Sequence, residues 1–124
     1  MLNGATAFSG YSTNDIPKAK AFYANTLGLN VTEENGALNL KFPNGQTVFI
    51  YPKDNHEPAT YTTLNIEVDD IEAAVDALVA NGVTFERYSE MSEQDERGIM
   101  RDQGPPIAWF TDPAGNILSL IKTS

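Results

Sequence analysis

Residues 8–29 of the chain read FSGYSTNDIPKAKAFYANTLGL and pass from a strand into a helix that is marked at both ends. Asn14 or Asp15 supplies a short polar side chain, which can cap the free N–H groups of a helix N-terminus. Pro17 stands in the first turn, where a missing N–H group has no cost, and Gly28 allows the left-handed backbone that ends a helix. Apolar residues between these ends recur at helical spacing. The stretch therefore predicts a strand followed by an amphipathic helix.

The second half of the chain repeats this order of signals. Residues 14–16 (NDI) resemble residues 69–71 (DDI), and residues 43–46 (PNGQ) resemble residues 113–116 (PAGN). Because the matched segments keep their order, we interpret them as an internal repeat. The distance between matched segments grows along the chain, which predicts an insertion in the second half, at residues 88–106.

Each half reads as strand, helix, strand, strand, strand. Asn35-Gly36 is typical of a two-residue hairpin turn, and further turns are expected at residues 43–46 and 112–116. We therefore expect an α+β fold of two βαβββ units, in repeats at about residues 4–52 and 60–122 of a single domain that spans residues 1–124. The strands are expected near residues 4–12, 30–34, 37–42, 47–52, 60–68, 84–88, 106–111 and 117–122.

Side chains of a strand alternate between the two faces of its sheet, so one aliphatic row assigns both faces. The aliphatic residues of segment 60–68 predict the face under the helices, and the pairing expected across Asn44-Gly45 sets Leu40 against Phe49 on the opposite face. That opposite face is aromatic, aliphatic and hydroxylated. It is either a core shared by two half-sheets or a cup for a small, largely apolar molecule. The predicted ligand cavity consists of Phe8, Leu40, Phe49, Tyr51, Tyr61, Thr63, Phe85, Phe110 and Ser119.

The composition excludes several classes of protein. The chain has 124 residues, of which 41% are hydrophobic and 20% charged, as in ordinary globular proteins. Its net charge of −9 repels phosphates and anionic lipid, so we expect neither a nucleic acid nor a membrane as partner. The absence of cysteine removes disulfides and thiolate chemistry, and the single histidine, His56, stands in a Pro-flanked loop that we expect to be exposed. No signal peptide or membrane span is recognised, so the expected location is the cytoplasm.

Three stretches together resemble the vicinal oxygen chelate superfamily, which contains glyoxalases, bleomycin resistance proteins and extradiol dioxygenases. They are residues 8–29, residues 64–82 (LNIEVDDIEAAVDALVANG) and residues 108–120 (AWFTDPAGNILSL). The resemblance covers nearly the whole chain. It implies curved mixed sheets that form an incomplete barrel around a site. In the metalloenzymes of this family, four side chains on the cavity face, usually His, Gln or Glu, bind a divalent ion.

The resemblance places these four ligand positions on Phe8, Phe49, Thr63 and Ser119. Two of these residues are phenyl rings and two carry neutral hydroxyls, a set that does not suit a hard divalent ion. A shift of the alignment by one residue does not bring a better ligand to any of the four positions. We therefore expect no metal and no other cofactor.

The insertion at residues 88–106 reads YSEMSEQDERGIMRDQGPP and mixes acidic with basic residues. In the family fold this stretch lies beside the mouth of the cavity. One interpretation is a lid, in which Met91, Ile99 and Met100 cover the apolar floor and Arg97 or Arg101 holds a ligand carboxylate. The alternative is a solvated loop whose charges pair among themselves.

The leading functional hypothesis is a metal-independent protein of the glyoxalase/bleomycin-resistance type that sequesters an apolar or cationic organic compound. The alternative is a glyoxalase-like enzyme, related to lyases, isomerases or dioxygenases, that uses non-standard cavity residues. A third is a structural module without a small ligand. Whether any reaction is catalysed, and by which residues, stays open; the candidate polar groups are Tyr51, Tyr61, Glu33, Glu67 and Arg87. We also expect a homodimer, because half-sheets with two apolar faces need covering.

Overall fold

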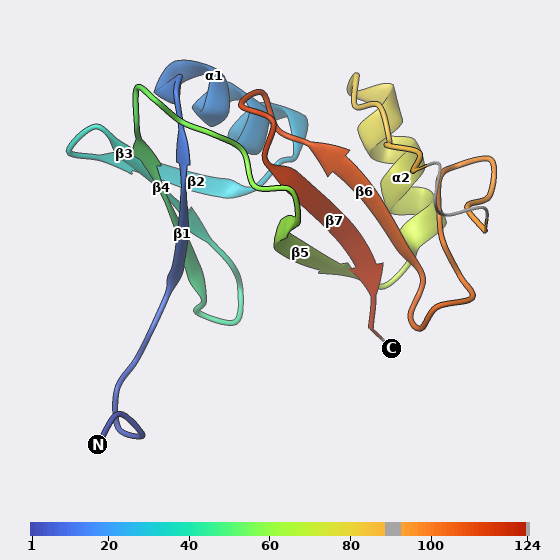
Figure 1. The fold of residues 1–124 in the computed structure, drawn as a ribbon, viewed down its shortest axis with the longest axis horizontal. Coiled ribbons are helices and arrows are strands. Elements are labelled where there is room, and N and C mark those ends of the chain that lie inside the picture. The colour runs from blue at the N-terminus through green and yellow to red at the C-terminus, as the bar shows by residue number, and fades with distance from the viewer. Residues whose placement is uncertain (89–92, 124) are drawn as a thin grey trace. The chain divides into compact units, whose positions relative to one another are not determined.

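The computed structural model describes residues 1–88 and 93–123. The chain divides into two compact units, Met1–His56 and Glu57–Ser124, and each unit has its own β-sheet (Figure 1). No helix within the described ranges is long and apolar enough to cross a membrane.

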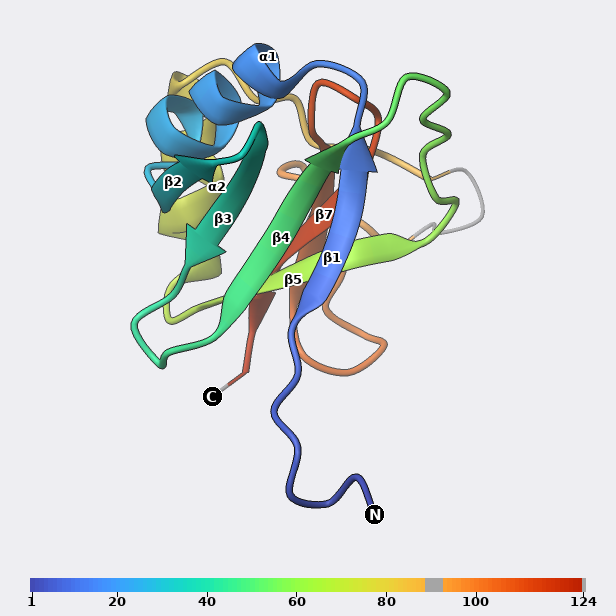
Figure 2. The same ribbon diagram turned by 90° about the vertical axis from the view of Figure 1, so that its left-hand side faces the viewer.

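The first unit is a four-stranded mixed sheet with one helical segment. Its elements are β1 (Ser9–Thr13), α1 (Ile16–Ala21), the π-helical turn η1 (Phe22–Thr26), β2 (Asn30–Glu34), β3 (Ala37–Lys41) and β4 (Thr47–Pro52). The strand order is β1-β4-β3-β2, and β1 runs parallel to β4, beside which it lies in Figure 2. The other neighbours are antiparallel. β1 begins later than predicted, at Ser9, because its pairing with β4 begins there.

The helical segment of the first unit begins where a side-chain cap is available. Oδ1 of Asp15 accepts a hydrogen bond from the backbone N–H of Lys18 at 3.0 Å, so Asp15 is the cap. The segment packs on the sheet through Tyr23, which is fully buried and whose hydroxyl lies 2.8 Å from that of Tyr11 in β1. Since Tyr11 pairs with Ile50 of β4, the row of side chains that contains Ile50 faces the helical segment.

The first hairpin of this unit has the predicted two-residue turn. Asn35 and Gly36 both have positive φ, at 53° and 80°, which is the backbone of a type I′ turn. Glu34 consequently pairs with Ala37, and Val31 pairs with Leu40. The expected register of β2 against β3 is confirmed.

The second hairpin differs from the prediction by one residue, and this moves Leu40 to the other face of the sheet. The N–H of Gly45 donates to the carbonyl of Phe42 at 3.0 Å, and that of Phe42 donates to the carbonyl of Gln46 at 3.0 Å. With Gly45 at a φ of 89°, the turn is a three-residue loop rather than a two-residue one. Leu40 therefore pairs with Val48, not with Phe49, and is fully buried on the helix side. The predicted pairing is therefore wrong, and Leu40 does not lie on the face predicted for the cavity.

The second unit has a three-stranded mixed sheet and one helix. Its elements are β5 (Thr62–Val68), α2 (Ile71–Ala80), β6 (Ile107–Thr111) and β7 (Ile117–Lys122). The order is β5-β7-β6, with β5 parallel and β6 antiparallel to β7. Asp70 caps α2 through a bond from the N–H of Ala73 at 3.1 Å. The β6–β7 turn is held by Asp112, whose Oδ1 accepts from the N–H groups of Ala114 and Asn116, both at 2.9 Å.

The strand predicted at residues 84–88 is not formed. A backbone bond joins this segment to β6, from the N–H of Glu86 to the carbonyl of Trp109 at 2.8 Å. The side-chain amide of Gln94 forms hydrogen bonds with the backbone of this segment, as a neighbouring strand would. It accepts from the N–H of Tyr88 at 2.9 Å and donates to the carbonyls of Glu86 at 3.0 Å and Gly98 at 2.9 Å.

The predicted α+β class with mixed sheets is confirmed. The paired strands form two separate sheets rather than one closed barrel. The first unit shows the full order strand, helix, strand, strand, strand. In the second unit an extended segment, completed by the Gln94 side chain, replaces the first strand after the helix.

Removal of the Gln94 amide tests this role. In Gln94→Ala, the backbone groups of Tyr88, Glu86 and Gly98 lose their partner, so we expect a loss of about 2 kcal/mol in the free energy of unfolding. Urea denaturation measures it. Gln103→Ala, at an exposed glutamine of the same insertion, is the control and should change stability little. Equal stability of the two variants would contradict the assignment.

Candidate functional site

The face of the first sheet that points away from α1 and η1 carries an aromatic surface. We call it the first distal face, and the strand register assigns to it Gly10, Ser12, Asn39, Phe49 and Tyr51. The rings of Phe49 and Tyr51 stack with centroids 5.9 Å apart, and the ring of Phe8 meets that of Phe49 edge-on at 6.2 Å. Phe8 is 67% exposed and Tyr51 38%. Three residues predicted for the cavity thus lie together in one unit.

Gly10 permits the close approach of β1 to Phe49. A Cβ atom at this position would lie 3.0 Å from the carbonyl oxygen of Phe49 and 3.5 Å from its Cβ. A larger residue would therefore press on the central ring of the aromatic surface. Sequence reasoning did not select Gly10, although a glycine within a strand is a signal of such an approach.

His56 is half-buried, not exposed as the loop pattern suggested. Its Nδ1 lies 2.6 Å from Oγ of Ser12, a buried residue that pairs with Tyr51 on the first distal face. The contact fastens the end of the first unit to β1. Because Ser12 is far from His56 in the sequence, the spacing of residues gave no sign of it.

The corresponding face of the second sheet carries a cluster of polar residues around one tryptophan. We call it the second distal face, and it contains Thr62, Asn65, Trp109 and Ser119. Ser119 pairs with Trp109 on one side and with Asn65 on the other. Its hydroxyl donates to Oδ1 of Asn65 at 2.6 Å, and the indole Nε1 of Trp109 donates to the hydroxyl of Thr62 at 3.1 Å. Of these four residues, the predicted cavity included only Ser119.

A β-bulge in β5 explains why Thr62 rather than Thr63 meets Trp109. The register shifts between Thr62 and Leu64, which pair with Ile117 and Leu118. Thr63, which stands between Thr62 and Leu64, therefore has no partner in the register. The Thr63 hydroxyl donates to the carbonyl of Ile117 at 3.0 Å and is used within the sheet. Tyr61, another predicted cavity residue, precedes the strand and is 70% exposed.

Phe110 and Phe85 lie on the helix side of the second sheet, not on the face predicted for the cavity. Phe110 pairs with Leu118 and is fully buried, which places it on the face opposite to Trp109 and Ser119. Its ring contacts that of Phe85 at 5.4 Å. Phe85 in turn lines a groove of about 370 Å³ along α2. The groove is lined by Val75, Asp76, Val79, Val83, Thr84, Phe85, Arg87, Glu96 and Arg97.

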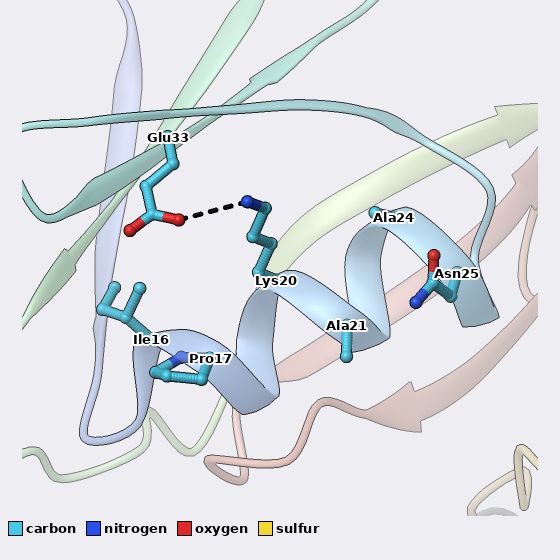
Figure 3. Close-up of a pocket in the computed structure, with 7 residues that line it drawn as sticks. All are labelled: Ile16, Pro17, Lys20, Ala21, Ala24, Asn25 and Glu33. Carbon is cyan, nitrogen blue, oxygen red and sulfur yellow. Dashed lines mark hydrogen bonds and ion pairs between the residues drawn. The ribbon is translucent and has the colours of Figure 1, made fainter.

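A shallow pocket of about 320 Å³ lies beside α1 (Figure 3). Lys20 and Glu33 form an ion pair of 3.2 Å at its edge. It is lined by Ile16, Pro17, Lys20, Ala21, Ala24, Asn25 and Glu33. Of these, Glu33 was predicted from the sequence as a candidate polar group of the cavity.

The four positions that the sequence aligned with metal ligands do not fit a divalent ion. Phe8 and Phe49 present rings to each other, with no donor atom. The hydroxyls of Thr63 and Ser119 donate to other groups of the protein, and neutral hydroxyls alone are weak ligands for zinc or iron. Within residues 1–88 and 93–123, no three His, Cys, Asp or Glu side chains are grouped as a metal site would require.

The charged candidates for acid–base chemistry each bind another group of the protein. Glu33 pairs with Lys20, and Glu67 accepts from the hydroxyl of Thr123 at 2.9 Å. The guanidinium of Arg87 donates to the carbonyl of Glu96. These contacts do not bring an acid and a base together at one point.

The residues predicted as a lid bind the second unit itself. Arg97 forms a two-point ion pair with Asp76 of α2, at 2.9 and 3.1 Å, and Arg101 pairs with Glu72 at 3.1 Å. Ile99 is fully buried and Met100 is 9% exposed. Met91, the third apolar residue of the predicted lid, lies outside the described residues. Closure over a ligand would require these contacts to break.

Asp95 organises this segment by accepting several hydrogen bonds. Its Oδ1 accepts from the N–H groups of Arg97 and Ile99, both at 2.9 Å, and its Oδ2 accepts from Arg101. Burial is the largest single influence and raises the pKa of Asp95. The bonds from Ile99, Arg97 and Arg101 together outweigh it, so the pKa lies below its usual value. The hydrogen bond from Arg97 likewise lowers the pKa of Asp76.

Comparison with known proteins gives one family over almost the whole chain. Residues 6–120 match the model of the Glyoxalase/Bleomycin resistance protein/Dioxygenase superfamily. Among curated proteins there is no match.

Solved structures share the fold over the full length of the chain. A superfamily member from Sphaerobacter thermophilus is 27% identical, with a TM-score of 0.69 over 95% of this chain and 98% of that one. The fosfomycin resistance protein FosX from Listeria monocytogenes is 16% identical, with a TM-score of 0.73 over 100% of this chain and 96% of that one. TnmS3, an antibiotic binding protein from a Streptomyces species, is 20% identical, with a TM-score of 0.70 over 98% of both chains.

The lowered pKa of Asp95 predicts how stability depends on pH. Its charged form is favoured by folding, so its contribution is present above the unfolded value of about 4 and is lost as pH falls through the lower folded value. In Asp95→Asn, which keeps the Oδ1 acceptor, this loss of stability at low pH should disappear. Urea denaturation between about pH 2 and pH 6 tests it, with Asp102→Asn at an exposed carboxylate as control. A gap between wild type and Asp95→Asn that stays constant with pH would contradict the prediction.

Proposed function

Since the chain belongs to the Glyoxalase/Bleomycin resistance protein/Dioxygenase superfamily, we propose that it is a metal-independent protein that binds a small organic molecule. The observation that carries the proposal is the chemistry of the four ligand positions. Phe8 and Phe49 form part of an exposed aromatic surface, and Thr63 and Ser119 bond to other groups of the protein. Such positions bind an organic molecule better than a metal ion.

The proposed ligand is a largely apolar or cationic compound. Aromatic rings such as Phe8, Phe49 and Tyr51 favour contact with flat apolar groups, and their faces also attract cations. The net charge of −9 attracts cations at long range. TnmS3 is an antibiotic binding protein and FosX is a fosfomycin resistance protein, which supports a small organic molecule as the ligand class.

An enzyme that uses other cavity residues is the weaker proposal. It would need a base or acid within reach of a substrate, and Glu33, Glu67 and Arg87 are already engaged with other groups.

We further propose that residues 1–124 form a single domain, with repeats at about 4–52 and 60–122, that acts in the cytoplasm. In the first unit the proposed binding surface consists of Phe8, Phe49 and Tyr51, and in the second unit it includes Ser119 on the second distal face.

A search for ligands by thermal shift tests the function directly. A library of small aromatic compounds, neutral and cationic, should contain some that raise the melting temperature. At a hundredfold excess over the dissociation constant, binding stabilises the folded state by about 2.7 kcal/mol. Phe49→Ala should weaken binding of these compounds roughly tenfold, because the central ring is lost. Val79→Ala, at an exposed apolar residue of α2, is the control and should bind them normally.

Metal content gives a separate test. Protein purified without chelators, then incubated with zinc, iron, nickel or manganese and desalted, should retain none of them stoichiometrically. Elemental analysis measures this. One tightly held ion per chain would contradict the metal-independent proposal, whatever ligands the thermal screen finds.

We also propose that the protein acts as a homodimer. The exposed aromatic residues Phe8 and Tyr61, at 67% and 70%, need cover by a ligand or a second copy. Light scattering at micromolar concentration should give about twice the chain mass of 13.5 kDa. A mass of one chain would reject the dimer and leave the binding proposal intact.

A further inference from the structure

The amide of Asn65 has a defined orientation on the second distal face. Ser119 is fully buried and its hydroxyl donates to Oδ1 of Asn65 at 2.6 Å. This bond assigns the oxygen of the amide to Ser119 and turns its NH₂ group the other way. Asn65 itself is exposed, and within residues 1–88 and 93–123 its NH₂ group donates to no other residue. The side chain therefore presents a pair of donors whose direction the protein fixes.

The Thr62 hydroxyl, like the Asn65 amide, accepts a hydrogen bond from the protein and keeps a donor for a ligand. Indole nitrogen is a donor only, so in the contact of 3.1 Å Trp109 donates and Thr62 accepts. The hydroxyl proton of Thr62 then remains for another acceptor, since the described part of the chain provides no partner for it. Trp109 is 8% exposed and its ring also meets that of Tyr88 at 5.5 Å, which holds the indole in place.

We propose that the second distal face selects ligands that carry an uncharged hydrogen-bond acceptor, such as a ketone, amide or nitro oxygen, next to an apolar body. The inference rests on the proposed small-molecule function and names the ligand class of that site. Asn65 and Thr62 each accept one hydrogen bond, from Ser119 and Trp109, and this leaves the N–H groups of Asn65 and the O–H group of Thr62 as donors for a ligand.

A neutral acceptor fits this face better than a carboxylate. Glu67 shares the face with Asn65, since the two residues alternate along β5 and are both exposed. Its carboxylate repels a second one, and the net charge of −9 adds to that repulsion at long range. A carbonyl oxygen accepts a hydrogen bond from either donor without this cost.

Two probes of equal shape separate the acceptor from the apolar body. Acetophenone and α-methylstyrene differ in that a carbonyl oxygen replaces a CH₂ group. Dissociation constants for both are measured by NMR titration of the full-length protein, and the result is the ratio of the two constants. Comparing this ratio between variants cancels the different hydrophobicity of the probes.

Asn65→Asp is the decisive variant. An aspartate still accepts the Ser119 hydrogen bond but has no N–H to donate. The constant for acetophenone should rise roughly fivefold relative to that for α-methylstyrene, as expected for one lost hydrogen bond. Thr62→Val should change the ratio in the same direction. Asn25→Asp, at an exposed residue of η1, adds the same charge elsewhere and should leave the ratio unchanged.

The outcomes separate the inference from the function it rests on. In the wild type, acetophenone should shift the side-chain NH₂ resonance of Asn65, and α-methylstyrene should shift it less. If both probes bind while the ratio is the same in Asn65→Asp and that resonance does not move, the inference is overturned and the binding function stands. If neither probe binds the folded protein up to its solubility limit, both the inference and the function proposed for this site are overturned.

Discussion

The length of each hairpin turn controls which side chains this protein presents on each sheet face. A shift of one residue in strand pairing moves every side chain to the opposite face. In the first unit, Gly45 makes a three-residue loop, and this single extra residue keeps Leu40 in the buried row with Val48. In the second unit, the turn between Thr111 and Ile117 places Trp109 beside Ser119. The polar and aromatic character of both distal faces depends on these two turns.

The two turns are stabilised in different ways. In the first loop, Gly45 adopts a positive φ at little cost, and Oδ1 of the exposed Asn44 accepts a hydrogen bond from the N–H of Gln46 at 3.0 Å. The second turn is specified by Asp112 and Asn116, which are 4% and 1% exposed and hydrogen-bonded to each other at 2.9 Å. Buried polar groups that lose a partner are costly, so this turn tolerates few changes.

Sequence patterns predicted the elements of the fold better than the faces of its strands. Helix caps and glycine stops are local: Asp15, one of the two caps predicted for the first helix, caps α1, and Asp70 in the repeated NDI/DDI segment caps α2. The faces depend on pairing between strands. The bulge before Leu64 brings Thr62 rather than Thr63 to Trp109, and an error of one residue in the predicted alternation put Phe110 on the wrong face. Alternation outward from Ser119 across the β6–β7 turn would have selected Trp109. The bond from Ser12 to His56 joins distant segments, and no local pattern signals it.

The same reasoning explains how a sheet face can lack metal ligands and remain specific. In a metal site the bound ion holds the ligand side chains in one orientation. Where no ion is bound, the protein itself must orient the side chains. On the second distal face this is done by pairs: Ser119 orients Asn65, and Trp109 orients Thr62. In each pair one residue is almost wholly buried, at 0% for Ser119 and 8% for Trp109, and the other is more accessible. A buried residue has few alternative rotamers, so its accessible partner is held in one orientation before any ligand arrives. Preorganised polar groups of this kind lose little entropy on binding, which is the condition for selecting a ligand through one or two hydrogen bonds.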